Sequence, residues 1–179
     1  MSLSQETRRL AFQVLFLLEA NGGGDASDLV AGIEEAHPAK ERAKAAALAN
    51  RAYEQRSEAD AAMLELAPTW PAHRQPAVDR AILRLAYHEI VSDAERGAIY
   101  VNEAVELAKQ FGTDKSPGFV NALLDRVLKK AQGKPTPAAD AGTTNLQGEF
   151  LDVLRRRLHH RRAEEEPRRV QAHRQAVRQ

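Results

Sequence analysis

The 179-residue sequence contains no cysteine, a single tryptophan and only 5% aromatic residues. Without cysteine the chain can form neither disulfides nor thiolate metal sites, which fits a reducing compartment. No apolar run approaches the roughly 20 residues that a membrane-spanning helix needs, and the N-terminus lacks the basic start and apolar stretch of a signal peptide. From these absences we expect a soluble, cytoplasmic protein.

Motifs of catalysis are missing as well. His88-Glu89 lacks the second histidine that a helical zinc motif places three residues after the glutamate. The glycine run 22–24 has neither a preceding strand nor the following Lys-Ser/Thr of a phosphate-binding loop, and no Gly-x-Ser-x-Gly elbow occurs. We therefore expect no enzyme, no metal and no cofactor, and a protein that works by binding.

The sequence has instead a strong helical periodicity. Between residues 79 and 130, apolar residues recur at spacings of three and four in the segments DRAILRLAYHEI, VNEAVELAKQFG and SPGFVNALLDRVLKK. This spacing predicts three consecutive short helices, the first apolar on more than half its circumference and thus buried on two sides. We expect a left-handed Gly112 to end the second, and Ser116 to cap the third with Pro117 at its first position.

Similar spacing predicts helices over residues 4–20, 25–36 and 39–67, the last one rich in alanine. The segment Pro68-Thr69-Trp70-Pro71 is expected to be a rigid connector in which Trp70 fills a seam between helical groups rather than serving as a ligand platform. No segment alternates apolar and polar residues long enough to predict a strand. The predicted fold is all-α, with about six or seven helices in two three-helix groups.

Charge is distributed unevenly along the chain. Residues 1–144 hold 17 Lys and Arg against 20 Asp and Glu, net −3, whereas residues 145–179 hold nine against five, net +4. We predict a helical domain over 1–132, a linker over 133–148 and a basic tail, helical or disordered, over 149–179. The tail either contacts phosphates or forms a solvated or oligomer-forming amphipathic helix. Its candidate phosphate contacts are Arg155, Arg156, Arg157, Arg161 and Arg162.

The blocks AILRLAYHEI, VNEAVELAKQFG and FVNALLDRVLKK, in this order and spacing, resemble the three most recognisable blocks of the NusB family of bacterial transcription antitermination factors. RRLAFQVLFLLEA is similar to the family's first helix, and the resemblance covers roughly residues 7–130. It implies an all-α fold of two three-helix groups and no catalysis. It also implies that the protein binds the boxA element of nascent rRNA leader transcripts with the ribosomal protein NusE, within the RNA polymerase antitermination complex.

The resemblance, together with the chemistry of RNA, gives six candidate RNA contacts. Cations neutralise phosphates, aromatic rings stack on unpaired bases, and amides read base edges. On this basis the phosphate contacts are Arg8, Arg9, Lys109 and Lys115, with Phe119 stacking and Asn121 reading a base edge. Core packing is the alternative for Phe119, and a solvated helix start is the alternative for the two arginines. Glu6 stands where the family has further arginines.

The resemblance also implies that NusE contacts the helix that holds Tyr87 and His88, although Tyr87 fits a simple core position nearly as well. Two other functions stay open. One is an accessory domain like that of rRNA cytosine methyltransferases, which would require a downstream cofactor-binding domain. The other is a helical protein-interaction module that has lost RNA binding.

Overall fold

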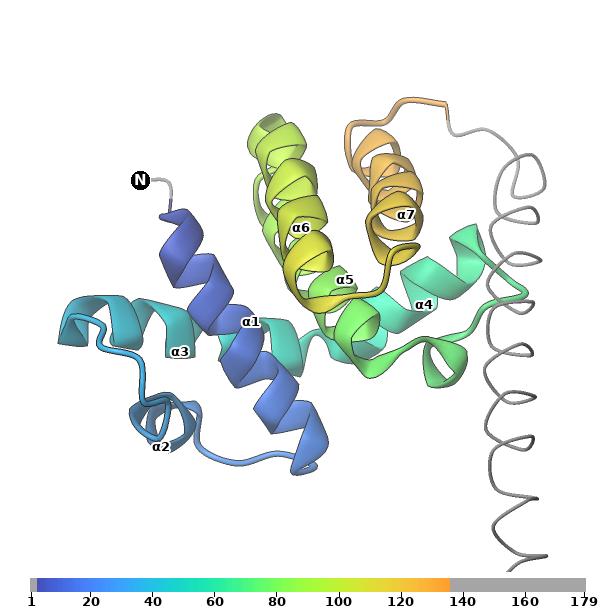
Figure 1. Ribbon diagram of the computed structural model, residues 1–179. Coiled ribbons are helices and arrows are strands. Elements are labelled where there is room, and N and C mark those ends of the chain that lie inside the picture. The colour runs from blue at the N-terminus through green and yellow to red at the C-terminus, as the bar shows by residue number, and fades with distance from the viewer. Residues whose placement is uncertain (1–2, 136–179) are drawn as a thin grey trace, which may run out of the picture. The chain divides into compact units, whose positions relative to one another are not determined.

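The computed structural model describes residues 3–135, and every regular secondary-structure element in this part is a helix (Figure 1). The predicted all-α class is therefore confirmed. The α-helices are α1 (Gln5–Ala20), α2 (Ala26–Ala31), α3 (Ala39–Glu54), α4 (Arg56–Leu66), α5 (Ala77–Ser92), α6 (Gly97–Phe111) and α7 (Ser116–Ala131), with short 3-10 turns at η1 (Ala72–Arg74) and η2 (Ala94–Arg96). None of the helices in this part is long and apolar enough to cross a membrane.

Helix α5 is the centre of the bundle. It contacts α1, α3, α4, α6 and α7, and its Ile82, Leu83, Leu85 and Ile90 are almost completely buried. This is the two-sided burial that its double apolar stripe predicts. Trp70, in the connector before α5, is also buried, and Gln75 Nε2 donates to its carbonyl oxygen at 3.1 Å. The tryptophan thus fills the protein interior, as expected.

Helix α1 begins at Gln5, one residue after the predicted start. Ser4 is its N-cap, and the Ser4 hydroxyl accepts a hydrogen bond from the backbone N–H of Thr7 at 3.1 Å. Helix α1 packs against the alanine-rich α3. The buried Ala45, Ala49 and Ala52 of α3 have small side chains that do not keep the two helices apart. Small residues therefore allow the close contact of these two helices.

The prediction of one continuous helix over residues 39–67 is wrong, because the helix is interrupted at Gln55, between α3 and α4. The Gln55 side chain donates to Glu58 Oε2 at 2.8 Å, and its Oε1 lies 2.8 Å from His88 Nδ1 on α5. The break lets α3 pack on α1 while α4 packs on α5 and α7. An alanine-rich sequence carries no signal for such a break, since the helical propensity is high on both sides of it.

The helix predicted over residues 25–36 also ends early, at Ala31. Beyond it, the Arg42 guanidinium binds backbone carbonyl oxygens in place of further helical turns. Its Nη2 donates to the carbonyls of Ile33 at 3.0 Å and Glu35 at 2.7 Å, and its Nη1 donates to the carbonyl of Val30. A side chain from α3 thus fixes the loop that precedes α3.

The turn between α6 and α7 differs from the prediction in two details. Gly112 has φ −89° and ψ −165°, an extended conformation rather than a left-handed one. Ser116 is the first residue of α7 rather than its cap, which makes Pro117 the second residue instead of the first. The Ser116 Oγ accepts a hydrogen bond from the backbone N–H of Thr113 at 2.9 Å. Glycine is needed at position 112 because of space: a Cβ there would lie 2.5 Å from Ser116 Cβ and 2.6 Å from the carbonyl oxygen of Ala108.

Replacing Gly112 by alanine is expected to lower the free energy of unfolding by about 1–3 kcal/mol, the usual cost of overpacking. The matched control is Gly118→Ala, because Gly118 lies inside α7 with nothing within 4 Å of its would-be Cβ. That substitution should raise stability by about 0.5–1 kcal/mol through helix propensity. Urea unfolding of both variants measures the two effects, and changes of the same sign would contradict the close approach at Gly112.

Candidate functional site

Four of the predicted RNA contacts come together where α6 meets α7. Lys109 lies in the last turn of α6, and Lys115 directly precedes α7, with Phe119 one turn further along; the Phe119 backbone N–H donates to the Lys115 carbonyl at 3.2 Å. Lys109, Lys115 and Asn121 are exposed, and Phe119 is partly buried. We call these four residues the α6–α7 corner.

The α6–α7 corner has the chemistry that binding a nucleic acid strand requires. Lys115, Gly118 and Asn121 follow one another at a spacing of three, so they share the exposed face of α7 with Phe119 at its border. Lys109 donates to Glu106 at 2.6 Å, a contact between exposed side chains that a phosphate can replace at little cost. Two exposed cations, a partly buried ring and an exposed amide thus lie around the turn between α6 and α7.

Arg8 lies elsewhere than predicted, inside the protein. Its side chain is only 4% exposed, and its Nε donates to Glu89 Oε1 at 2.8 Å. The guanidinium also donates to the Leu3 carbonyl at 3.0 Å and lies 5.3 Å from the ring centroid of Tyr100. Neither a phosphate contact nor a solvated helix start describes this residue: it is half of a buried ion pair between α1 and α5.

Glu89 is the residue that sequence reasoning missed. Burial raises the pKa of its carboxyl group, and the neighbouring Arg8 charge lowers it in part. The signal was present in the sequence, because Glu89 continues the apolar stripe of Ile82, Leu85 and Ala86 on α5. A carboxylate on an apolar stripe requires a buried partner.

Arg9 stays near the surface and binds other residues than Arg8 does. Its Nη2 donates to Glu6 Oε1 at 2.6 Å and to Glu35 Oε1 at 2.5 Å, and these bonds raise the pKa of the guanidinium. Arg8 is buried in an ion pair, whereas Arg9 binds two surface carboxylates. The two arginines therefore do not form a joint phosphate site.

Tyr87 and His88 also face different neighbours. His88 Nδ1 is held by Gln55, and burial, followed by the charge of Arg51, lowers the pKa of the imidazole. Tyr87 lines a cleft of about 150 Å³ together with Leu66, Val91 and other residues of α4, α5 and α7. The two residues therefore do not form one continuous surface.

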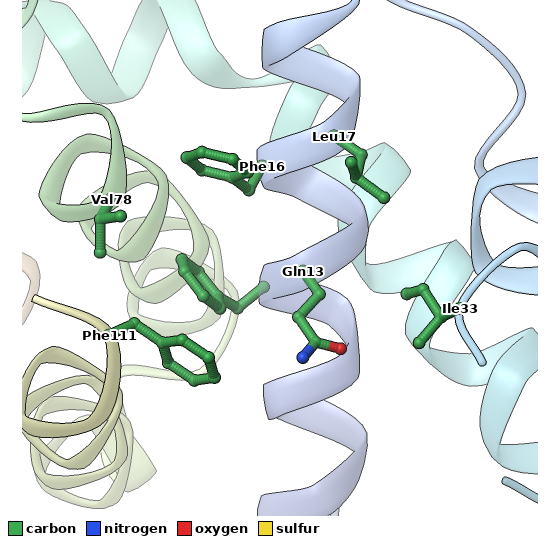
Figure 2. A pocket seen from close by; sticks show the side chains of 7 residues that line it. Gln13, Phe16, Leu17, Ile33, Val78 and Phe111 are labelled. Carbon is green, nitrogen blue, oxygen red and sulfur yellow. The ribbon is translucent and has the colours of Figure 1, made fainter. Parts of the chain in front are cut away.

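A groove on α1 has walls that are almost entirely apolar and a volume of about 350 Å³ (Figure 2). Phe12 packs against Phe111 of α6 with ring centroids 5.0 Å apart and against Phe16 at 6.4 Å. Figure 2 shows Gln13 in the middle of the groove. The full lining is Phe12, Gln13, Phe16, Leu17, Ile33, Val78 and Phe111. The sequence alone did not predict this groove, because its walls come from segments that are distant along the chain.

The tail arginines Arg155, Arg156, Arg157, Arg161 and Arg162 lie outside the described residues.

Comparisons with known proteins agree with the helical architecture. A family model described as the NusB family matches residues 5–129. A transcription antitermination protein NusB from Herpetosiphon aurantiacus is 40% identical over 139 residues, covering 74% of this chain and 94% of the relative. A protein of the same description from Geobacter sulfurreducens is 36% identical over 131 residues, covering 71% and 94%.

Solved structures share the fold. NusB from T. maritima superposes with a TM-score of 0.62 at 29% identity, covering 70% of this chain and 90% of that one. A crystal structure of antitermination factors NusB and NusE in complex with dsRNA gives a TM-score of 0.62 at 22% identity, covering 70% and 96%.

Proposed function

The chain belongs to the NusB family of transcription antitermination proteins, and we propose that it binds a boxA-like segment of an rRNA leader transcript together with ribosomal protein NusE, within the RNA polymerase antitermination complex. The family predicted from the sequence is thus the correct one. NusB proteins are not catalytic, so the chain is a transcription antitermination factor and not an enzyme.

The α6–α7 corner supports the RNA half of this proposal. Lys109 and Lys115 flank the turn and are accessible to phosphates, while Phe119 and Asn121 offer a stacking surface and an edge-reading amide to an unpaired base. Arg9 becomes a further phosphate contact if its guanidinium leaves Glu6 and Glu35. The tail arginines at 155–157, 161 and 162 add cations that sequence alone places near the end of the chain.

The groove on α1 supports the NusE half. Phe16 and Phe111 are partly buried at this apolar depression, and Phe12 is buried beneath it. Aromatic residues around an apolar depression are typical of protein interfaces, whose central contacts are enriched in large rings. Phe111 lines the groove and ends α6, so a partner in the groove lies next to the α6–α7 corner. Tyr87, with the exposed Val91, is a proposed second and smaller contact. The NusB relative crystallised with NusE and dsRNA supports simultaneous binding of both partners.

Replacing Lys109 and Lys115 together by alanine is expected to weaken binding of boxA-like RNA in the presence of NusE and to flatten its salt dependence. For a single strand, each phosphate that the protein no longer neutralises reduces the slope of log K against log salt by about 0.7, so the slope of the double variant should fall by about 1.4. Fluorescence anisotropy at several salt concentrations measures this slope.

The matched control is Lys40→Ala with Lys130→Ala. Both lysines are exposed, and Lys130, at the far end of α7, pairs with Glu65 as Lys109 pairs with Glu106. The slope of log K against log salt for this control variant should stay at the wild-type value. Equal slopes for the two double variants would show that the α6–α7 corner is not the RNA-binding surface. Absence of RNA binding by the wild type, with and without NusE, would favour an interaction module that does not bind RNA.

A further inference from the structure

We propose that Glu6, Glu35 and His37 form a binding site for a divalent transition-metal ion of the Zn²⁺ class. One ligand atom from each side chain lies within 4.8 Å of the other two. The sequence predicted no metal because the ligands come from separate places, the first turn of α1 and the loop between α2 and α3. The inference needs neither RNA nor NusE and stands apart from the proposed function.

His37 is the observation that points to a ligand. Its side chain is only 7% exposed, and its Nε2 has no hydrogen-bond partner among the described residues. This nitrogen lies 3.5 Å from Glu35 Oε2, so it faces the carboxylate cluster. A buried nitrogen that makes only this long contact and no hydrogen bond is unfavourable, and coordination of a metal would satisfy it.

The loop that carries two of the ligands is already held in place. Arg42 donates to the backbone carbonyls of Ile33, Glu35 and His37 at 3.0, 2.7 and 3.4 Å. Groups that fix the ligand-bearing backbone reduce the ordering that metal binding requires. Arg42 is thus a positioning residue for the site.

The two carboxylates can adjust to a bound ion. A tetrahedral Zn²⁺ with bonds of about 2.1 Å requires ligand atoms about 3.4 Å apart. His37 Nε2 and Glu35 Oε2 are already 3.5 Å apart, and all three ligand atoms lie within 4.8 Å of one another, so the cluster needs only a small contraction. Glu6 and Glu35 have side chains 58% and 47% exposed, so they can change rotamer, whereas buried His37 stays fixed. One imidazole with two carboxylates suits Zn²⁺, while Mg²⁺ and Ca²⁺ prefer oxygen ligands alone.

Arg9 is the cation that pairs with both carboxylates in this structure. It binds Oε1 of both Glu6 and Glu35, whereas Oε2 of Glu35 faces His37. The same guanidinium nitrogen, Nη2, thus pairs with both carboxylates, at 2.6 and 2.5 Å. A metal ion and the guanidinium would therefore compete for the same two anions.

Isothermal titration of the full chain with Zn²⁺ tests the site. The tail contains His159, His160 and His173, so these three are first replaced by alanine to give a background variant. The background should bind one Zn²⁺ per chain. Glu35→Gln and His37→Ala should each weaken this binding by at least about tenfold, the lower end of the effects seen for metal-supporting side chains.

Two further variants complete the test. His73→Ala, which removes a histidine away from the cluster, should bind as the background does. Arg9→Ala should bind Zn²⁺ about threefold or more tightly, because two surface ion pairs no longer compete. Unchanged affinity in Glu35→Gln and His37→Ala, or no binding by the background up to about 1 mM Zn²⁺, would overturn the site. Since Glu35 is exposed, its glutamine variant keeps the test valid if His37→Ala unfolds.

Discussion

Replacing Arg8 by alanine is expected to lower the free energy of unfolding by about 3–5 kcal/mol at neutral pH. The guanidinium is buried against Glu89 at 2.8 Å, with side chains 4% and 8% exposed. Removal of the guanidinium leaves the negative charge of Glu89 buried and without its ion-pair partner. Urea denaturation monitored by circular dichroism measures the change.

The pH dependence of this destabilisation identifies its cause. Burial raises the pKa of Glu89 in the folded protein, so the unfolded chain releases this proton first and stability falls as the pH rises above the ordinary glutamate pKa of about 4.3. Without Arg8 the folded pKa rises further. The deficit of Arg8→Ala should therefore be largest near neutral pH and small below about pH 4, where Glu89 is protonated in both states.

Two controls separate the buried pair from general effects of losing an arginine. Arg9→Ala removes a neighbouring cation from surface ion pairs and should cost at most about 1 kcal/mol. Adding Glu89→Gln to Arg8→Ala removes the uncompensated charge and should restore part of the stability. If Arg8→Ala costs no more than Arg9→Ala at neutral pH, the buried ion pair does not stabilise the fold.

Local signals in the sequence were sufficient to predict most of the helices. Helices α1, α5, α6 and α7 each have an apolar stripe that repeats every three to four residues, and burial of that stripe determines the helix whatever its neighbours are. At the break, the Gln55 side chain contacts His88, which lies on another helix and 33 positions along the chain. No local pattern encodes such a contact.

The candidate sites divide in the same way. Lys109, Lys115, Phe119 and Asn121 lie on either side of one turn, so they are close along the chain, and their contact with RNA stays a prediction. Arg8 was assigned to the surface because its partner Glu89 is 81 positions away. The groove on α1 and the Glu6, Glu35 and His37 cluster were missed for this reason too, since each is assembled from segments that only the tertiary fold brings together.

Replacing Phe16 by alanine is expected to weaken the affinity for NusE by about 30-fold or more, the effect of losing an aromatic residue from the centre of an interface. Phe16 lines the apolar groove on α1 and is only partly buried in the free protein (Figure 2). A partner that covers the groove would complete the burial of its ring. Binding of purified NusE by isothermal titration measures the change in affinity, and the melting temperature shows whether the fold is kept.

Two variants locate the interface. Leu64→Ala removes a leucine that is 45% exposed on α4, outside the groove, and should leave the NusE affinity unchanged. Tyr87→Ala should weaken binding less than Phe16→Ala, because its cleft is less than half the volume of the groove. If Phe16→Ala binds NusE like the wild type while Tyr87→Ala does not, the partner occupies the cleft between α4, α5 and α7. In that arrangement Phe111 no longer links the protein partner to the α6–α7 corner, and RNA and NusE would bind to separate faces of the bundle.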